Sequence, residues 1–158
     1  MKIVKQLFSF ILPVTALIII PILVERNFKP RYMFTTGPGL LLIFAGLILM
    51  ALTISSFIKI GKGTLAPWSP TKKLVTKGLY AHVRNPMILG VLIILLGESI
   101  MFLSVNILAW AVIFFLINNI YFSVSEEPGL EKRFGDEYLN YKKNVPRWIP
   151  RLKPFLNR

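Results

Sequence analysis

Four stretches of the chain are long and almost free of charged residues, and they set the expected architecture. A helix that crosses a bilayer needs about 20 apolar residues, with a range of ~17–25. The stretches that meet this length cover residues 7–24, 40–58, 86–104 and 106–124. One acid, Glu98, interrupts the third stretch. The pattern predicts an all-α, polytopic membrane protein with four transmembrane helices in a single membrane domain covering residues 1–158.

The segments between these stretches differ in length and polarity. Ser104-Val105-Asn106 is all that separates the last two stretches, which predicts a tight helical hairpin. A long loop, residues 59–85, joins the second and third spans, and a polar tail covers residues 125–158. Pro128-Gly129 is expected to break or bend the chain after the fourth span. Residues 130–143 then carry apolar side chains at helical spacing, which predicts an amphipathic helix on the inner leaflet.

The charge balance supports a membrane protein and indicates its orientation. Charged residues make up 16% of the chain, yet the net charge is +12, and no DNA-binding motif accompanies this basic excess. Basic residues concentrate in loops on the cytoplasmic side of membrane proteins. The N-terminus, the 59–85 loop and the C-terminal tail are therefore expected in the cytoplasm, with the protein in the inner or plasma membrane. The chain has no cysteine, so it holds neither a disulfide nor a thiolate metal site.

Polar and aromatic residues cluster where the third span begins. Tyr80, His82 and Arg84 precede Asn85-Pro86, which opens the apolar run. Asn is a good N-cap and Pro is favoured in the first helical turn, so helix capping accounts for the last two. It does not account for the other three, although Arg84 also suits an anchor in anionic headgroups.

Two adjacent acids, Glu126 and Glu127, close the fourth span. A carboxylate is unfavourable at a helix C-terminus, where the helix dipole is already negative. The pair therefore indicates a cationic partner, either Arg84 of the neighbouring loop or a ligand.

The segments LVTKGLYAHVRNPMILG and EEPGLEKRFGDEYLNYKKNVPRWIP resemble the isoprenylcysteine carboxyl methyltransferase and phospholipid methyltransferase superfamily of integral membrane enzymes. The superfamily pattern has a G-x-Y-x-x-x-R-(H/N)-P segment, a helical hairpin, and then E-E-x-x-L-x-x-x-F-G-x-x-Y-x-x-Y-x-x-x-V-P-R. Both segments keep this spacing here from Leu74 to Arg147, about half of the chain. The resemblance implies an S-adenosylmethionine-dependent methyltransferase with a lipophilic acceptor, either an isoprenylcysteine-like carboxylate or a lipid amine. It implies no metal.

The resemblance also implies a set of site residues. Arg84 and Glu126 are the catalytic candidates, and Glu126 would pair with the positive charge of the donor. The cofactor-binding candidates are Leu74, Val75, Tyr80, Asn85, Pro86, Met87 and Glu126. For an amine acceptor, His82 is the candidate base. The acceptor would enter from the bilayer, so membrane lipids are the expected surroundings of the site.

Two positions depart from the superfamily pattern, and two other functions stay open. Ile88 replaces the usual tyrosine after the R-N-P-M segment. Phe122 stands where the eukaryotic prenylcysteine enzymes carry an arginine for the substrate carboxylate. The alternatives are a sterol-reductase-like membrane enzyme that uses NADPH, and a non-enzymatic scaffold or transporter subunit.

Overall fold

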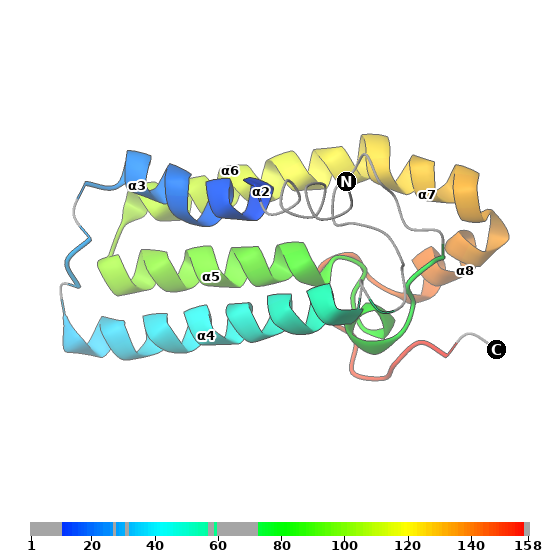
Figure 1. Cartoon of the computed structure of the whole chain (residues 1–158), viewed down its shortest axis with the longest axis horizontal. Helices are drawn as coiled ribbons and strands as arrows, with labels where there is room; N and C mark the ends of the chain where they lie inside the picture. Colours follow the sequence, from blue (N-terminus) through cyan, green and yellow to red (C-terminus); the bar gives the residue numbers. More distant parts are fainter. Residues whose placement is uncertain (1–10, 27, 31, 57–58, 60–72, 157–158) are drawn as a thin grey trace.

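The described part of the chain is helical in the computed structural model (Figure 1). It comprises residues 11–26, 28–30, 32–56, 59 and 73–156, and these residues form no strand. The start of the first expected span and residues 60–72 of the 59–85 loop, including Lys62 and Lys72, lie outside the described residues. Lys2, Lys5 and Arg31 also lie outside them.

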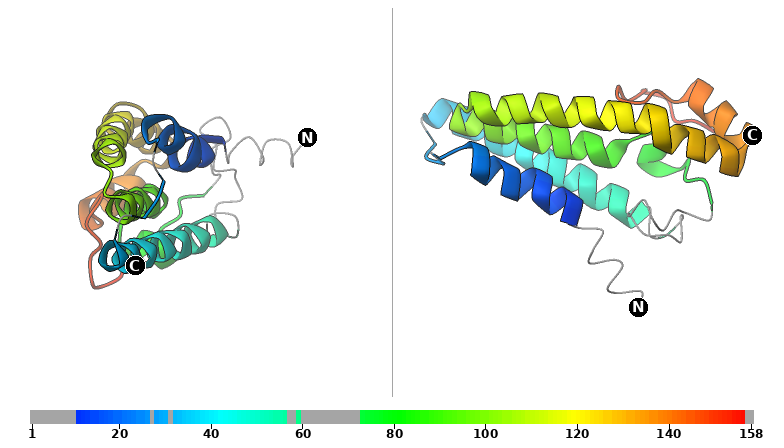
Figure 2. Two further views of the ribbon diagram at one scale, coloured as in Figure 1. Left: turned by 90° about the vertical axis from the view of Figure 1, so that its left-hand side faces the viewer. Right: turned by 90° about the horizontal axis from the view of Figure 1, so that it is seen from above.

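Four helical segments lie side by side along their long axes (Figures 1 and 2). The first is continuous through α2 (Ile11–Val14), the π-helix η1 (Thr15–Ile19) and α3 (Ile20–Val24). The other three contain α4 (Met33–Ser56), α5 (Pro86–Phe102) and α6 (Val105–Tyr121). Two helices, Met33–Ser56 and the continuous helix Val105–Phe134, are long and apolar enough to cross a membrane. Thr15–Val24 and Pro86–Phe102 are shorter apolar helices.

Helices α4 and α5 approach each other closely because glycines face each other across their contact. A Cβ atom at Gly97 would lie 2.7 Å from the carbonyl oxygen of Gly39 and 3.0 Å from the backbone nitrogen of Ile43. A Cβ at Gly46 would lie 2.7 Å from the carbonyl oxygen of Gly90. Small residues of this kind let membrane helices pack backbone to backbone.

This packing explains why the second helix begins earlier than expected. The predicted start at residue 40 is wrong, because α4 already begins at Met33 and contains Pro38. The hydroxyls of Thr35 and Thr36 donate to the carbonyl of Tyr32 at the start of the helix. The contact of Gly39 with α5 then holds this turn in the helix, although Gly and Pro have low helix propensity.

The hairpin between α5 and α6 is present and even shorter than predicted. Only Leu103 and Ser104 lie between the two helices. Leu103 has a left-handed backbone, with φ 49°, which ends α5. The hydroxyl of Ser104 accepts a hydrogen bond from the backbone N–H of Ile107 at 3.1 Å and thus caps α6. The same hydroxyl donates to the carboxylate of Glu25.

The expected break at Pro128-Gly129 is wrong. Helix α6 continues through the π-helix η4 (Phe122–Glu126) into α7 (Glu127–Phe134). A π turn leaves carbonyl groups without their usual α-helical donor, so the missing N–H of Pro128 is tolerated directly after it. Glu126 and Glu127 therefore do not lie at a helix C-terminus, which the argument from the helix dipole assumed.

The expected single amphipathic helix over residues 130–143 is also wrong. Gly135 separates α7 from α8 (Asp136–Asn144) with φ 53° and ψ −130°, a conformation that suits glycine alone. Tyr138, Tyr141 and Val145 are buried against one another, with Phe134 and Leu74 packed on them. The aromatic face thus packs inside the protein and does not lie on a leaflet.

Candidate functional site

The candidate site lies where the apolar helices end, at the end of the bundle that carries α7 and α8 (Figure 1). Three segments meet here: the loop from Lys73 to Asn85, the η4–α7 junction, and α8 with the tail that follows it. The loop contains a short 3₁₀-helix, η3 (Gly78–Ala81), which begins at Gly78 with φ 64°. Glu126 and Glu127 lie beyond Val124, where the long apolar run of the continuous helix ends.

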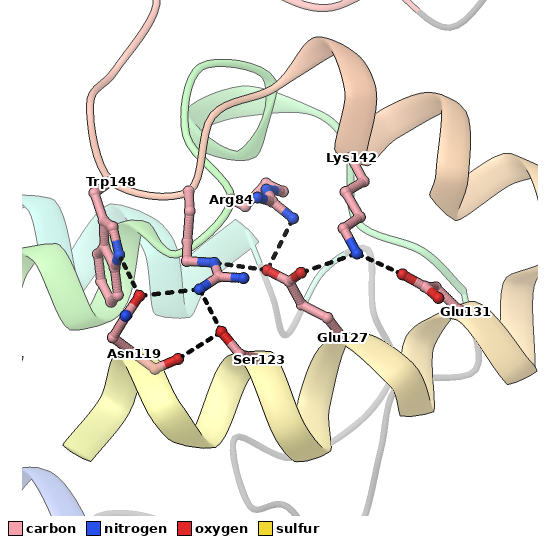
Figure 3. A network of polar contacts seen from close by, with 8 residues as sticks. Arg84, Asn119, Ser123, Glu127, Glu131, Lys142 and Trp148 are labelled. Carbon is pink, nitrogen blue, oxygen red and sulfur yellow. Dashed lines mark hydrogen bonds and ion pairs between the residues drawn. The ribbon is translucent and has the colours of Figure 1, made fainter. Parts of the chain in front are cut away.

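Glu127 is the centre of a buried ion network (Figure 3). One carboxylate oxygen accepts from Arg84 Nη1 at 2.9 Å and from Arg147 Nε at 2.8 Å. The other oxygen pairs with Lys142 Nζ at 3.2 Å. The Glu127 side chain is only 6% exposed. Burial raises the pKa of Glu127, but the hydrogen bond from Arg147 and the charge of Arg84 outweigh it and lower the pKa below its ordinary value.

The network continues onto the flank of α6 (Figure 3). Arg147 Nη1 donates to Asn119 Oδ1 at 2.9 Å and to Ser123 Oγ at 2.8 Å. Trp148 Nε1 donates to the same Asn119 oxygen at 3.1 Å. These bonds tie the tail to one face of the continuous helix, since Asn119, Ser123 and Glu127 lie four residues apart on successive turns.

Glu126 lies in a different environment from Glu127. Burial, and next the charge of Glu127, raise the pKa of Glu126 to about 7, although the charge of Arg133 opposes this. Burial, and next the charge of Glu126, raise the pKa of the Tyr80 phenol, so the two groups lie within electrostatic range of each other. The pKa values of the two adjacent carboxyl groups are thus shifted in opposite directions, and of the two only that of Glu126 lies near neutral pH.

The loop that carries Tyr80 is held by α8. The Tyr141 hydroxyl donates to the backbone carbonyl of Tyr80 at 2.7 Å. Burial and the neighbouring Tyr80 raise the pKa of Tyr141, so this hydroxyl keeps its proton and donates across the neutral range. Val75 is 6% exposed and belongs to the buried part of the loop.

The structure brings most of the predicted residues to one end of the bundle. Tyr80 lies near Glu126, and Arg84 lies in the network of Glu127. Asn85 occupies the N-cap position of α5, yet its side chain makes no capping hydrogen bond. The remaining candidates are the buried Pro86 and the partly buried Met87 in the first turn of α5, the partly buried Leu74 on the aromatic cluster, and Val75.

Arg84 is a cationic partner of the acidic pair, one of the two alternatives that the sequence left open. Its guanidinium is paired with Glu127, not with Glu126, and its side chain is 12% exposed. Its Nε atom is buried and has no hydrogen-bond partner among the described residues. Arg84 thus keeps one donor available within an otherwise satisfied network.

His82 does not have both ring nitrogens available for proton transfer. Its Nδ1 lies 2.7 Å from the carbonyl oxygen of Arg151. A carbonyl oxygen only accepts, so Nδ1 carries a proton and donates it to this bond. Only Nε2 remains to act as a base.

The site residues predicted from the sequence leave out most of this network, namely Asn119, Ser123, Glu127, Lys142, Arg147 and Trp148, although a cationic partner was expected for the acidic pair that includes Glu127. Three signals were present. The sequence has two adjacent acids, so Glu127 was a candidate beside Glu126. Arg147 is the last residue of the V-P-R motif at the end of the tail pattern. Asn119, a polar residue within an apolar span, was the third indication.

Taken together, the apolar helices and the polar end of the bundle fit a membrane enzyme whose site lies at the edge of its apolar region. A model of the phospholipid methyltransferase family matches residues 34–137. The match includes Arg84, Glu126 and Glu127. The chain therefore belongs to the phospholipid methyltransferase family, and the superfamily that the sequence motifs indicated is confirmed.

Individual relatives agree with this membership. The protein-S-isoprenylcysteine O-methyltransferase of Schizosaccharomyces pombe is 38% identical over 83 residues, which cover 49% of this chain and 33% of that protein. The human protein of the same name is 35% identical over 91 residues, covering 54% of this chain and 30% of that protein. An uncharacterized protein of Haemophilus influenzae is 45% identical over 65 residues, which cover 40% of this chain and all of that protein.

The region matched in the methyltransferases is thus about a third of their own length. No solved structure matches the chain.

Proposed function

We propose that this protein is an integral membrane methyltransferase that uses S-adenosylmethionine and acts on a lipophilic acceptor. The observation that carries the proposal is the family match over residues 34–137, which contains the loop and the η4–α7 junction of the candidate site. The names of the relatives support the same reaction class, because they are O-methyltransferases of an isoprenylated cysteine.

The residues at the end of the bundle fit a small charged donor. S-adenosylmethionine carries a sulfonium, an amino group and a carboxylate. Glu126 titrates near neutral pH and is the acid suited to the positive charge. The unpartnered Nε of Arg84 and the backbone N–H groups at the start of α5 suit the carboxylate. Leu74, Val75, Tyr80, Asn85, Pro86 and Met87 would complete the pocket.

When bound, the donor supplies an electrophilic methyl group, and transfer removes the positive charge from sulfur. The chain's own residues would bind the donor, orient it toward the membrane and exclude water. Correct alignment of donor and acceptor contributes ~7–11 kcal/mol to such reactions. Glu127 would act by positioning Arg84, since it contacts that guanidinium directly.

The proposed topology has four spans with both termini in the cytoplasm. In the described residues, the end of the bundle that carries the site holds Lys73, Lys77 and Arg84 in the loop and the basic residues of α7 and α8. The opposite end carries Arg26 and Lys29 beside Glu25. This asymmetry supports a cytoplasmic site, reached by the acceptor from the bilayer.

The class of acceptor is proposed only as lipophilic. Phe122, at the position of the arginine in the eukaryotic prenylcysteine enzymes, is buried and packs its ring 5.8 Å from that of Trp148. An aromatic ring therefore occupies the place from which a guanidinium would meet a substrate carboxylate. An isoprenylcysteine-like carboxylate and a lipid amine both remain to be screened as acceptors.

Calorimetric titration of the detergent-purified protein tests the proposal, with S-adenosylmethionine and NADPH titrated in parallel. Saturable binding of S-adenosylmethionine alone supports it. Binding of NADPH alone would assign the chain to the reductase-like alternative.

A Glu126→Ala, Tyr80→Ala double variant tests the site, and Glu137→Gln, on the exposed surface of α8, is the matched control. Binding is expected to be lost in the first variant and kept in the second. Unchanged binding in the double variant would refute the assignment of these residues to the donor site.

A further inference from the structure

The C-terminal strap, residues 146–156, is fastened to the site loop by its backbone. The N–H of Arg84 donates to the carbonyl of Pro146, and the N–H groups of Arg151 and Phe155 donate to the carbonyls of His82 and Ala81, each at 2.9 Å. His82 Nδ1 adds a fourth bond to the strap. Because main-chain atoms make most of these contacts, the attachment depends little on which side chains point outward.

The strap lies level with the apolar part of α6. Trp148 packs its ring 5.1 Å from that of Phe115 and donates to Asn119. Asn119 precedes Glu126 by seven residues, which is about 10 Å along a helix at ~1.5 Å per residue. In Figure 1 the strap, in red, folds back from α8 toward the ends of α4 and α5.

The outward side chains of the strap are apolar. Ile149 is 79% exposed, Leu152 is 97% exposed and Leu156 is 73% exposed. A soluble surface rarely presents three large aliphatic residues in such a short segment. On α6, which the strap contacts through Trp148, Leu116 and Ile120 are also exposed. Lys153 is exposed among them, and its long side chain can place its charge at the headgroups.

We infer that the strap docks into the bilayer leaflet nearest the site, with Ile149 and Leu152 among the acyl chains. The occupant of this surface is lipid, because the strap contacts a membrane helix through Trp148 and its outward side chains are large and aliphatic. Docking would hold Ala81, His82 and Arg84 through the backbone bonds, so the bilayer itself would support the site loop. The inference does not depend on the reaction that the protein catalyses.

The chain has no cysteine, so single cysteines can be introduced and spin-labelled without background. Leu152→Cys and Ile149→Cys report on the strap. Glu137→Cys, exposed on α8, is the aqueous control, and Ile113→Cys, exposed in the middle of α6, is the lipid control. All four positions are exposed, so the labels should leave packing intact, which circular dichroism checks.

Each labelled protein is placed in phospholipid nanodiscs, and its accessibility to oxygen and to a water-soluble nickel complex is measured by electron paramagnetic resonance. The strap labels are expected to be more accessible to oxygen than to the nickel complex, like the label at Ile113. The label at Glu137 is expected to be more accessible to the nickel complex. A strap label as accessible to nickel as Glu137 would overturn the inference. A label shielded from both reagents would also overturn it, because a second copy or another protein would then cover the strap.

A second variant separates side-chain docking from backbone attachment. Ile149→Glu with Leu152→Glu leaves every backbone bond of the strap possible but places two acids on the outward face. A label at Lys153→Cys is expected to gain nickel accessibility in this background. Unchanged accessibility there would contradict the docking role of the two apolar side chains.

Discussion

Replacing Glu127 with glutamine removes the carboxylate that three cations share. Arg84 and Arg147 are 12% and 20% exposed, so both would keep a largely buried positive charge without its partner. Breaking a buried ion pair from one side typically costs about 3–5 kcal/mol. Lys142 adds little to this, because its side chain is 38% exposed and solvent screens it. The expected loss of unfolding free energy is therefore ~3–5 kcal/mol.

Glu131→Gln is the matched control for this substitution. Glu131 pairs with Lys142 at 2.6 Å, but both side chains are about one third exposed. Exposed pairs of this kind contribute ~0–1 kcal/mol. Both variants are unfolded in mixed detergent micelles by titration with a denaturing detergent, and helicity is followed by circular dichroism. Equal destabilisation by the two substitutions would refute the central role of Glu127.

The pH dependence gives an independent check. The pKa of Glu127 in the folded protein lies below the ordinary value of 4.5. The stabilisation from its carboxylate is therefore complete above pH 4.5 and is lost as pH falls through the lower folded pKa. The difference between the native protein and Glu127→Gln should shrink across that acidic range.

Three further predictions concern particular positions. Gly97→Ala would place a methyl group 2.7 Å from a carbonyl oxygen of α4 and should cost ~1–3 kcal/mol by overpacking. Gly37→Ala, with nothing within 4 Å, should leave stability equal or higher in the same unfolding titration; equal losses would exclude close packing as the cause. Gly135→Ala should lower the free energy of unfolding by ~1–3 kcal/mol, because the backbone φ at this position is 53°. Gly129→Ala, inside α7, should raise the free energy of unfolding by ~0.5–1 kcal/mol. The reverse order would show that the backbone turn at Gly135 does not need glycine. Finally, the pKa of Glu126 is about 7. The affinity for S-adenosylmethionine, measured by calorimetry, should therefore rise as pH increases through 7, and in Glu126→Gln it should not change over this range. A rise that persists in the variant would assign the titration to another group.

Local patterns account for the parts of the structure that the sequence predicted well. The apolar runs form helices because a helix satisfies the backbone N–H and C=O groups of an apolar segment by hydrogen bonds within the segment. The short Ser104 junction forces α5 and α6 into a hairpin. The motif residues gather at one end of the bundle because each of them borders an apolar run. None of these results requires knowledge of which helices touch.

The errors in the prediction share one physical cause, which is contact between distant segments. The second span was expected to begin at residue 40, after Gly37-Pro38-Gly39, yet the approach of α5 at Gly39 holds this segment in a helix. The aromatic residues of the tail suggest a membrane-facing stripe, yet they pack on the loop at Leu74. Propensity and periodicity describe a segment in isolation, and tertiary contacts override them where burial stabilises another arrangement.

The sequence by itself determined that the chain is a helical membrane protein of the phospholipid methyltransferase family, with an acidic pair facing a basic loop. Only the tertiary structure decided how the two acids divide their roles. Glu127 binds Arg84, which lies 43 positions earlier in the chain, and Arg147, which lies 20 positions later. Glu126 lies one residue earlier on the helix, and its charge acts on Tyr80. Successive residues on a helix point about 100° apart, so the neighbours that each side chain meets depend on how the loop and tail pack around it.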